Sequence, residues 1–425
     1  MFFSREGRGS LSRRIHYALA GILLVILVIL VASGGSGKGA GTEGGMAKAS
    51  GLKAALTRIV DAEPRPSKVD YARLDRLLTE LAGRKPVVGL AVAVVENGEI
   101  RFMKGYGETV AGSGDPVTTS TVFRWASVSK GVAADMVAKL AAEGELSLYD
   151  PAGKYAPSLR LPGAAEQKAT VSDILSHRLG LFAHANDSKL EDGMDARLLR
   201  SELATLNLIC PPSQCHAYQN VAYDAASEIV EKVTGQPYPQ AVRERLFMPL
   251  GMTSATATRE GLYAAKSWAR PHRGGKESKP VEVTDSYYRV PAAGGINSSI
   301  KDLALWMIAQ MGGMPDVLPE GALEAVQTPL TATPGELGRL RIARERLKSA
   351  QYGLGWRIYD YAGHRVVGHR GGVTGYRSLI LFDPQQKSGV VALWNSATSQ
   401  PAGIEFEVLD MLYGLEPKDW LKLES

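Results

Sequence analysis

The chain has 425 residues, of which 45% are hydrophobic and 22% are charged, and this composition is typical of globular proteins. Its formal net charge is +5 at pH 7, and residues 1–33 contribute +3 of it through four arginines and one glutamate. The remaining +2, without a long basic stripe, argues against nucleic acid as a partner.

An apolar segment follows the basic N-terminus. Residues 17–32, YALAGILLVILVILVA, carry no charge, as is typical of an export signal. As a helix they would span about 24 Å, less than a hydrocarbon core of about 30 Å, yet they exceed the core of most cleaved signals. The sequence favours a signal-anchor over residues 17–33, with residues 1–16 as a basic cytoplasmic tail, and leaves a cleaved signal peptide open. In both cases the rest is exported to the periplasm or another extracytoplasmic space, and an anchor would hold it in the inner membrane.

Residues 34–65 are predicted to be a flexible linker, because SGGSGKGAGTEGG is rich in glycine and serine. Gly37-Lys38 superficially resembles part of a phosphate-binding loop. Gly39 replaces the required serine or threonine, and no soluble strand precedes the segment, so we reject that function. No cofactor is predicted.

The segments that follow predict a helix and then a hairpin. Tyr71 and four leucines recur on one face of a helix over residues 69–82. Two apolar runs then flank Asn97-Gly98, a dipeptide that favours a tight turn between strands. Residues 366–395, near the C-terminus, contain further strand-like runs separated by turn residues.

The middle of the chain is predicted to be helical and rich in loops. Residues 226–235 and 300–313 have helical patterns that end at glycine. Residues 314–350 are charged and irregular, which indicates a surface excursion. This order predicts an α+β fold over residues 66–425, in which both ends of the chain build one sheet around a helical insertion.

Cys210 and Cys215, in CPPSQC, are the chain's two cysteines. In an oxidising compartment they could close a short disulfide loop, and two free buried thiols are the alternative. This spacing, without a second ligand cluster, is poor for zinc, so no metal site is predicted.

A serine and a lysine lie three residues apart in FRWASVSKGVAADMVAKLAAEG. The apolar residues from Val132 to Leu140 have helical spacing, which puts Ser127 at a helix N-terminus with Lys130 one turn away. A serine hydroxyl needs a base, and lysine can serve if burial or a nearby cation lowers its pKa. The helix N-terminus would stabilise an oxyanion. Taken alone, the pair is more typical of an N-capping serine beside a solvated lysine.

Two further motifs follow in order, YQN at residues 218–220 and HRGG at residues 369–372. The set S-x-x-K, Y-x-N and [KH]-x-G resembles the serine β-lactamase and penicillin-binding-protein superfamily, over about residues 68–415. The tyrosine motif resembles the branch of class C β-lactamases, D,D-carboxypeptidases, D-aminopeptidases and related esterases. The resemblance implies a β-lactamase/transpeptidase-like α/β fold, an antiparallel sheet flanked by helices beside a mostly helical subdomain.

The resemblance also implies a role for each matching residue. Ser127 would be the acylated nucleophile, Lys130 would deprotonate it, and Tyr218 would relay a proton to the leaving group. A tyrosine near two cations can have a lowered pKa, which would suit that task. Asn220 would bind the acyl amide of the substrate and orient Lys130. The backbone N–H groups of Ser127 and Gly372 would form the oxyanion hole.

The HRGG motif would supply the remaining substrate contacts. Gly371 and Gly372 lack side chains, so substrate could lie against their strand. His369 replaces the lysine typical of β-lactamases; it can be neutral or cationic near pH 6.5, and it fits the peptidase and esterase pattern better. Arg370 could grip a substrate carboxylate, or point away and form a surface pair, and Arg377 is a second candidate.

The other histidines that we considered give weaker indications of a functional role. His177 is expected to pack and cap, while His184 and His216 flank possible cleft loops, and His216 could tune the site. A Ser–His–Asp triad is not expected, because no G-x-S-x-G elbow is present.

The expected reaction is acyl transfer to Ser127 followed by hydrolysis. The substrate would be an amide or ester, such as a D-amino-acid peptide or a small acyl ester. Two alternatives stay open, a true class C-like β-lactamase and a catalytically silent, membrane-tethered protein that binds peptidoglycan.

Overall fold

The predicted hairpin begins the central sheet. In the computed structural model, which describes residues 66–424, β1 (Gly89–Glu96) and β2 (Glu99–Gly107) pair antiparallel on either side of the Asn97-Gly98 turn. The φ angles of these two turn residues are 56° and 82°, the left-handed conformation that such a turn requires.

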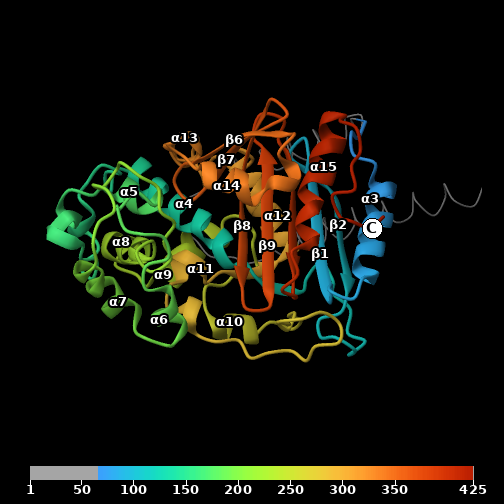
Figure 1. Cartoon of the computed structure of the whole chain (residues 1–425), viewed down its shortest axis with the longest axis horizontal. Helices are drawn as coiled ribbons and strands as arrows, with labels where there is room; N and C mark the ends of the chain where they lie inside the picture. The colour runs from blue at the N-terminus through green and yellow to red at the C-terminus, as the bar shows by residue number, and fades with distance from the viewer. Residues whose placement is uncertain (1–65, 425) are drawn as a thin grey trace, which may run out of the picture. The chain divides into compact units, whose positions relative to one another are not determined.

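Both ends of the chain contribute to one eight-stranded antiparallel sheet, as the sequence predicts (Figure 1). The strand order is β2-β1-β10-β9-β8-β7-β6-β5, so the N-terminal hairpin pairs with the last strand. The C-terminal strands of this sheet are β5 (Thr331–Ala332), β6 (Leu347–Tyr352), β7 (Arg357–Tyr361), β8 (His364–Val373), β9 (Tyr376–Asp383) and β10 (Ser388–Trp394). A separate pair is formed by β3 (Val122–Arg124) and β4 (Asn297–Ser299).

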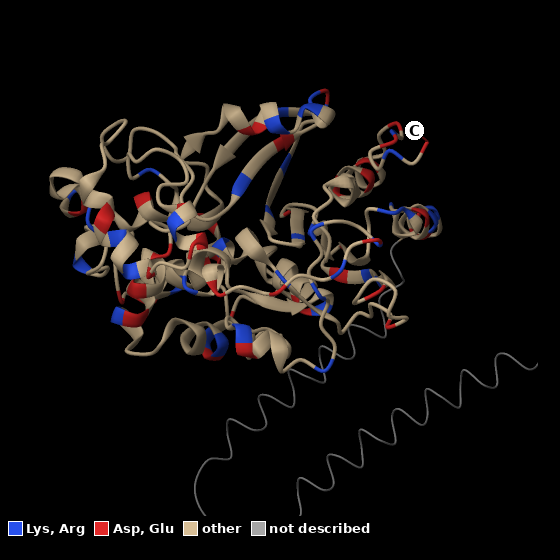
Figure 2. Ribbon diagram, turned by 60° about the horizontal axis from the view of Figure 1, so that its bottom comes forward, with Lys and Arg blue, Asp and Glu red and all other residues tan. Residues whose placement is uncertain are grey.

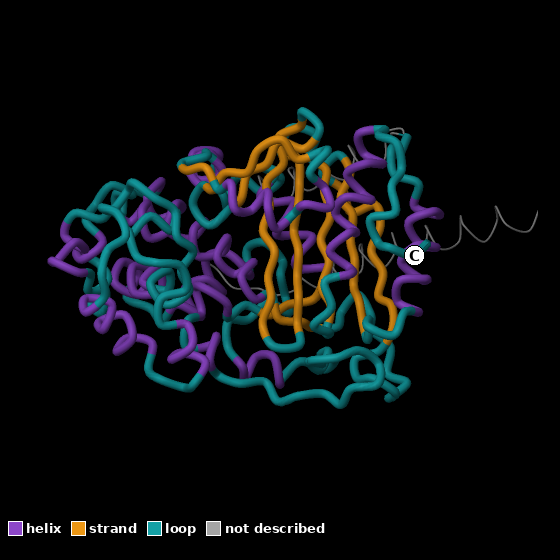
Figure 3. Tube along the Cα trace, in the orientation of Figure 1, coloured by secondary structure: helices purple, strands orange, loops and turns teal. Residues whose placement is uncertain are grey.

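Helices cover the sheet and build a subdomain beside it (Figure 3). Those that pack on the sheet include α3 (Tyr71–Gly83), α12 (Ile300–Gln310) and α15 (Ile404–Tyr413), and α4 (Ser129–Ala142) shares a hydrophobic core with one face of it. The insertion between β3 and β4 contains α5 (Val171–Leu175), α6 (Asp187–Glu191), α7 (Ala196–Glu202), α8 (Ala225–Thr234), α9 (Tyr238–Val242), α10 (Arg259–Tyr263) and α11 (Pro291–Gly294). Two more helices, α13 (Glu320–Gln327) and α14 (Pro334–Arg339), precede β6.

The sheet is buried on both faces, which explains the unbroken apolar run of β1. Side chains alternate between the two faces of a strand. Alternate residues of β1 beginning with Leu90 pack with α3 and α15 in one hydrophobic core. Those beginning with Ala91 pack with α4 and α12 in a second core. The turn η1 (Ala126–Val128), which carries Ser127, contacts β8 and β9 and leads into α4, which carries Lys130, so both residues are placed at this face of the sheet.

Residues 314–350 lie mostly at the surface, as predicted, but the prediction that they are irregular is wrong. This segment contains α13, β5, α14 and part of β6, and α14 carries Glu336 with only 9% of its surface exposed. The elements are as short as two residues in β5 and six in α14, too short for a clear apolar period to appear in the sequence.

The predicted tail, signal-anchor and linker lie outside the described residues. Between residues 66 and 424, no helix is both long and apolar enough to span a membrane. Basic and acidic residues are interspersed along the ribbon of this domain (Figure 2).

Candidate active site

Ser127 lies on a tight turn that leads into α4. The turn, η1 (Ala126–Val128), begins with Ala126 at a φ of 49°, a left-handed conformation that is uncommon for residues other than glycine. Ser129, the other serine of the motif, is buried and accepts the N–H of Ile296 at 3.0 Å. Ser127 is partly exposed, so it is the serine that a substrate can reach.

Lys130 is fully buried and points its amine at Ser127. Its Nζ donates to Oδ1 of Asn220 at 2.7 Å and to the carbonyl of Ala293 at 2.8 Å, and lies 3.4 Å from Oγ of Ser127. Since an amide oxygen and a carbonyl can only accept, these two contacts use two N–H groups. The third position of the amine faces the serine hydroxyl, where a neutral lysine carries its lone pair.

The surroundings favour that neutral form. Burial lowers the pKa of Lys130 to about 7, since the charged amine loses its hydration. The carboxylates of Asp187 and Asp224 oppose this shift, and Arg357 adds to it. The lowered pKa agrees with the condition that the sequence argument set for a lysine base.

Tyr218 lies between these groups and the sheet. Nζ of Lys130 is 4.8 Å from the centre of its ring, and the guanidinium of Arg357 is 5.7 Å away. The predicted lowering of its pKa is wrong. Burial raises the pKa of Tyr218, while a hydrogen bond with Ser127 and the charge of Arg357 oppose the shift only in part. Tyr218 therefore holds its proton at neutral pH and begins as a donor.

Asn220 is held from both ends of its amide. Its oxygen accepts from Lys130, and its Nδ2 donates to Oδ2 of Asp187 at 2.7 Å. The same carboxylate oxygen also accepts from Nδ1 of His184 at 2.8 Å. The structure thus contains the contact expected to orient Lys130, while the contact with substrate stays a prediction. Asp187 was missed, and its position at the start of α6 carries no motif that could have identified it.

His369 lies in β8 beside Tyr218 and is buried. Its Nδ1 faces the carbonyl of Arg370 at 2.7 Å, and its Nε2 faces the hydroxyl of Tyr352 at 3.2 Å. Burial lowers the pKa of His369 well below its usual value, and the charges of Arg357 and Lys130 lower it further. Of the two charge states that the sequence leaves open, the neutral one is favoured.

The two glycines of the HRGG motif differ in what a side chain at each position would contact. A Cβ at Gly371 would lie 2.3 Å from both the carbonyl of Trp125 and the hydroxyl of Ser378. Gly371 is therefore needed for packing against the residue before η1, rather than for substrate as predicted. A Cβ at Gly372 would meet only the end of the Arg377 side chain, at 3.1 Å, which leaves the predicted role of Gly372 possible.

Arg370 does not point at the nucleophile. Because side chains alternate along β8, it faces the side of the sheet opposite His369. Its guanidinium donates to Glu405 at 2.9 Å, to the hydroxyl of Tyr359 at 3.0 Å and to Glu336 at 3.4 Å. Both carboxylates are buried, so neither a grip on substrate nor a surface pair describes it.

Arg377, the second candidate for a substrate carboxylate, lies on β9 opposite Gly372. Its Nε donates to the carbonyl of Ala397 at 2.8 Å.

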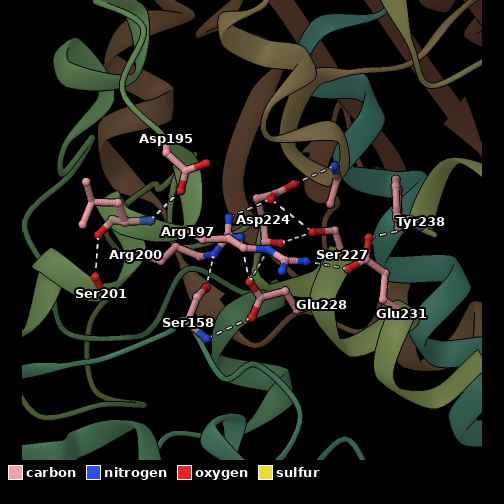
Figure 4. Close-up of polar contacts among 12 residues, drawn as sticks. Ser158, Asp195, Arg197, Arg200, Ser201, Asp224, Ser227, Glu228, Glu231 and Tyr238 are labelled. Atoms are coloured by element: carbon pink, nitrogen blue, oxygen red, sulfur yellow. Dashed lines mark hydrogen bonds and ion pairs between the residues drawn. The ribbon is translucent and has the colours of Figure 1, made fainter. Parts of the chain in front are cut away.

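A second buried cluster supports the site from the helical subdomain (Figure 4). Arg200, with 2% of its side chain exposed, donates to Asp224 at 2.8 Å and to Glu228 at 2.9 Å. The other oxygen of Asp224 accepts the N–H of Ala292 at 2.9 Å, one residue before the carbonyl that accepts from Lys130. Sequence reasoning missed this cluster, because an arginine in α7 and two acids at α8 carry no common motif.

A hollow of about 450 Å³ lies beside Tyr218. Its lining includes Arg357 and the partly exposed apolar side chains of Phe182 and Ile209. The structure joins Cys210 and Cys215 by a disulfide, which closes the loop that forms one edge of the hollow.

His216 also lines this hollow, and burial lowers its pKa to about 4. His177 is buried beneath Tyr218, as expected for a packing residue, with their ring centres 4.3 Å apart. Among residues 66–424 no three potential metal ligands lie close enough together to hold an ion.

Comparisons with known proteins agree on one protein family. The family model described as Beta-lactamase matches residues 74–410. "Penicillin-binding protein 4" of Amycolatopsis lactamdurans is 30% identical over 76% of this chain and 84% of its own length. "Esterase EstB" of Burkholderia gladioli is 28% identical over 74% of this chain and 80% of its own length.

Further similarity comes from one peptidase and one solved structure. The "D-alanyl-D-alanine-carboxypeptidase/endopeptidase AmpH" of Escherichia coli K12 is 28% identical over 48% of this chain and 54% of its own length. The octameric penicillin-binding protein homologue from Pyrococcus abyssi superposes with a TM-score of 0.73 at 26% identity, over 83% of this chain and 79% of that chain.

Proposed function

Because the chain belongs to the beta-lactamase family and is a serine hydrolase, we propose that it cleaves an amide or an ester through an acyl-enzyme on Ser127. The observation that carries the proposal is the setting of Lys130. Two acceptors hold two of its N–H groups, burial lowers its pKa to about 7, and the remaining position faces the serine hydroxyl.

The proton follows these contacts. As Oγ of Ser127 attacks the substrate carbonyl, its proton passes to the lone pair of Lys130. Tyr218, protonated at the outset, gives its hydroxyl proton to the leaving nitrogen or oxygen as the carbonyl bond to that atom breaks, and recovers a proton from Lys130. Water then attacks the acyl-enzyme and gives one proton to Lys130, which passes it to Oγ as the bond from Oγ to the acyl carbon breaks. This step releases the acid and restores the Ser127 hydroxyl and neutral Lys130. The N–H groups of Ser127 and Gly372 would hold the oxyanion.

The substrate we favour is a D-amino-acid peptide or a small acyl ester. The names of the relatives, an esterase, a D-alanyl-D-alanine carboxypeptidase and a penicillin-binding protein, support this range. The hollow beside Tyr218 would receive the leaving group, since Tyr218 protonates that part of the substrate. A neutral His369 lacks the cation that lysine provides in β-lactamases, which argues against the β-lactamase alternative.

We also propose that the domain acts outside the cytoplasm, tethered by residues 17–33. The disulfide between Cys210 and Cys215 supports an oxidising compartment.

The test is hydrolysis of p-nitrophenyl butyrate by the full-length protein. Ser127→Ala should lose turnover at least about a hundredfold, because the activated nucleophile is gone. Ser129→Ala is the matched control, since that serine serves the backbone of Ile296, and it should retain turnover. Equal turnover in the wild type and Ser127→Ala would exclude Ser127 as the nucleophile. If none of the proteins acts on the ester, a panel of D-amino-acid peptides decides between a narrow peptidase and a silent binding protein.

A further inference from the structure

Hydrogen bonds beneath the active site join the tyrosine motif to β8 through three buried side chains. The N–H of Gln219 donates to Nδ1 of His177 at 3.1 Å. Nε2 of His177 lies 3.2 Å from the hydroxyl of Tyr352, and that hydroxyl lies 3.2 Å from Nε2 of His369. Nδ1 of His369 lies 2.7 Å from the carbonyl of Arg370.

The two ends of this chain of contacts fix the direction of every bond in it. A backbone N–H can only donate, so Nδ1 of His177 is an acceptor and its proton is on Nε2. A carbonyl can only accept, so Nδ1 of His369 carries a proton, and in the neutral ring that burial favours Nε2 is the acceptor. The hydroxyl of Tyr352 then accepts from His177 and donates to His369. The two histidines are opposite tautomers, and both are neutral.

We propose that His177 and Tyr352 are positioning residues that keep His369 neutral and hold β8 at a fixed distance from the loop that carries Tyr218. This inference rests on the proposed function, because it assigns how the parts of that catalytic site are kept in register. His369 then binds no substrate through its ring nitrogens, since both have partners within the protein.

Protonating His369 would break this arrangement. A new proton on Nε2 would turn that nitrogen from an acceptor into a donor, so the hydroxyl proton of Tyr352 would lose its acceptor inside the protein. The charged groups around His369 act in the same direction. Lys130 on α4, Arg357 on β7 and Arg370 on β8 all disfavour a further positive charge.

These contacts fix the position of the loop that carries Tyr218 relative to β8, and the proposed catalysis depends on that position. His177 also holds the tyrosine loop through its backbone, because its carbonyl accepts the N–H of Ala217 at 2.9 Å. His369 lies three residues before Gly372, whose N–H we assign to the oxyanion hole. A shift between these two halves would move the proton donor Tyr218 away from the oxyanion donors.

The direct test is spectroscopic. Long-range ¹H–¹⁵N correlation of ¹⁵N-histidine in the full-length protein distinguishes the protonated nitrogen of each ring, and the variants His177→Gln and His369→Gln assign the signals. The expected spectrum shows His177 protonated at Nε2 and His369 at Nδ1, both unchanged between pH 5 and pH 8. A His369 signal that titrates in this interval, or the same tautomer in both rings, would overturn the proposal whatever the enzyme's activity.

The kinetic test is Tyr352→Phe, which removes the shared hydroxyl and keeps the buried ring. We expect kcat to fall by about ten- to a hundredfold with little change in KM, while both rings keep the tautomers that the N–H of Gln219 and the carbonyl of Arg370 fix. Tyr361→Phe is the matched control, because it removes another buried hydroxyl of the same sheet, bonded to Asp410 at 2.6 Å on the opposite face. The control should lose comparable thermal stability and keep its kcat. A kcat of Tyr352→Phe equal to that of the control would refute a positioning role.

Discussion

Two of the buried cations among residues 66–424, Arg200 and Lys130, have opposite kinds of direct partner. Arg200 in the helical subdomain is paired with two carboxylates, Asp224 and Glu228 (Figure 4). Lys130 beneath the nucleophile has only neutral acceptors as direct partners, Asn220 and the carbonyl of Ala293. A guanidinium keeps its charge in proteins, so Arg200 is a permanent cation that its two carboxylates stabilise, whereas Lys130 is able to lose its proton.

The direct partners match the chemistry of each cation: carboxylates stabilise a charge that is never lost, and neutral acceptors leave the charge of a buried lysine uncompensated. Taking a charge out of water is costly, and a directly paired carboxylate offsets much of that cost. Lys130 receives only distant help from Asp187 and Asp224, and burial therefore lowers its pKa to about 7. A base with a pKa near the working pH is the most effective for proton transfer.

The largest effect should follow from removing the unpaired cation. Lys130→Met is expected to lower kcat/KM by at least about a thousandfold, because it removes the base whose amine lies 3.4 Å from Oγ of Ser127. Thermal unfolding should change less than in an Arg200 variant, since no buried carboxylate is left unpaired. Ester hydrolysis and a melting curve measure the two quantities. Turnover within tenfold of the wild type would mean that another group is the base.

Removing Arg200, the cation that is paired with carboxylates, should lower stability more than activity. Arg200→Met leaves the carboxylate of Asp224 buried without its cation and Glu228 with only Arg197 at 3.4 Å, which costs about 3–5 kcal/mol of unfolding free energy. Activity per folded molecule should suffer less than in Lys130→Met. Chemical denaturation monitored alongside initial rates separates the two. A variant as stable as the wild type would show that the ion pairs contribute nothing net.

Local sequence patterns predicted the structural elements that depend only on residues close together in the sequence. The turn at Asn97-Gly98 depends on its own backbone, and the spacing of Ser127 and Lys130 follows from one helical turn. The antiparallel sheet flanked by helices came from the family resemblance and is confirmed by the structure and its solved relative.

The partners of the site residues could not be predicted in the same way. Asp187, Tyr352 and Arg357 reach the site from separate elements, and no spacing in the sequence links them to Ser127. For the same reason the sequence indicated cations near Tyr218 but not the burial that raises its pKa. The direction of Arg370 was predictable, because a residue next to His369 on a strand must face the other side of the sheet.

The smallest predicted effect tests the comparison most directly, because Asp224 belongs to both regions. It pairs with Arg200, it braces the backbone beside Ala293, and its charge raises the pKa of Lys130. Since Lys130 must be neutral to act, kcat/KM should rise with pH through about 7 in the wild type. Asp224→Asn keeps an oxygen that can accept the N–H of Ala292 but removes the negative charge. The pKa of Lys130 should therefore fall, and the rising (acid) limb of the pH profile of kcat/KM should move to lower pH.

Glu228→Gln is the matched control for this shift. It removes one carboxylate from the same arginine, at 2.9 Å, but Glu228 is not among the charges that act on Lys130. Both variants should lose stability, and only Asp224→Asn should move the limb, in a pH profile of kcat/KM measured on folded protein. Equal limbs in the two variants would mean that the Arg200 cluster acts on the site only through packing. A limb that moves to higher pH in Asp224→Asn would mean that the titrating group is not Lys130.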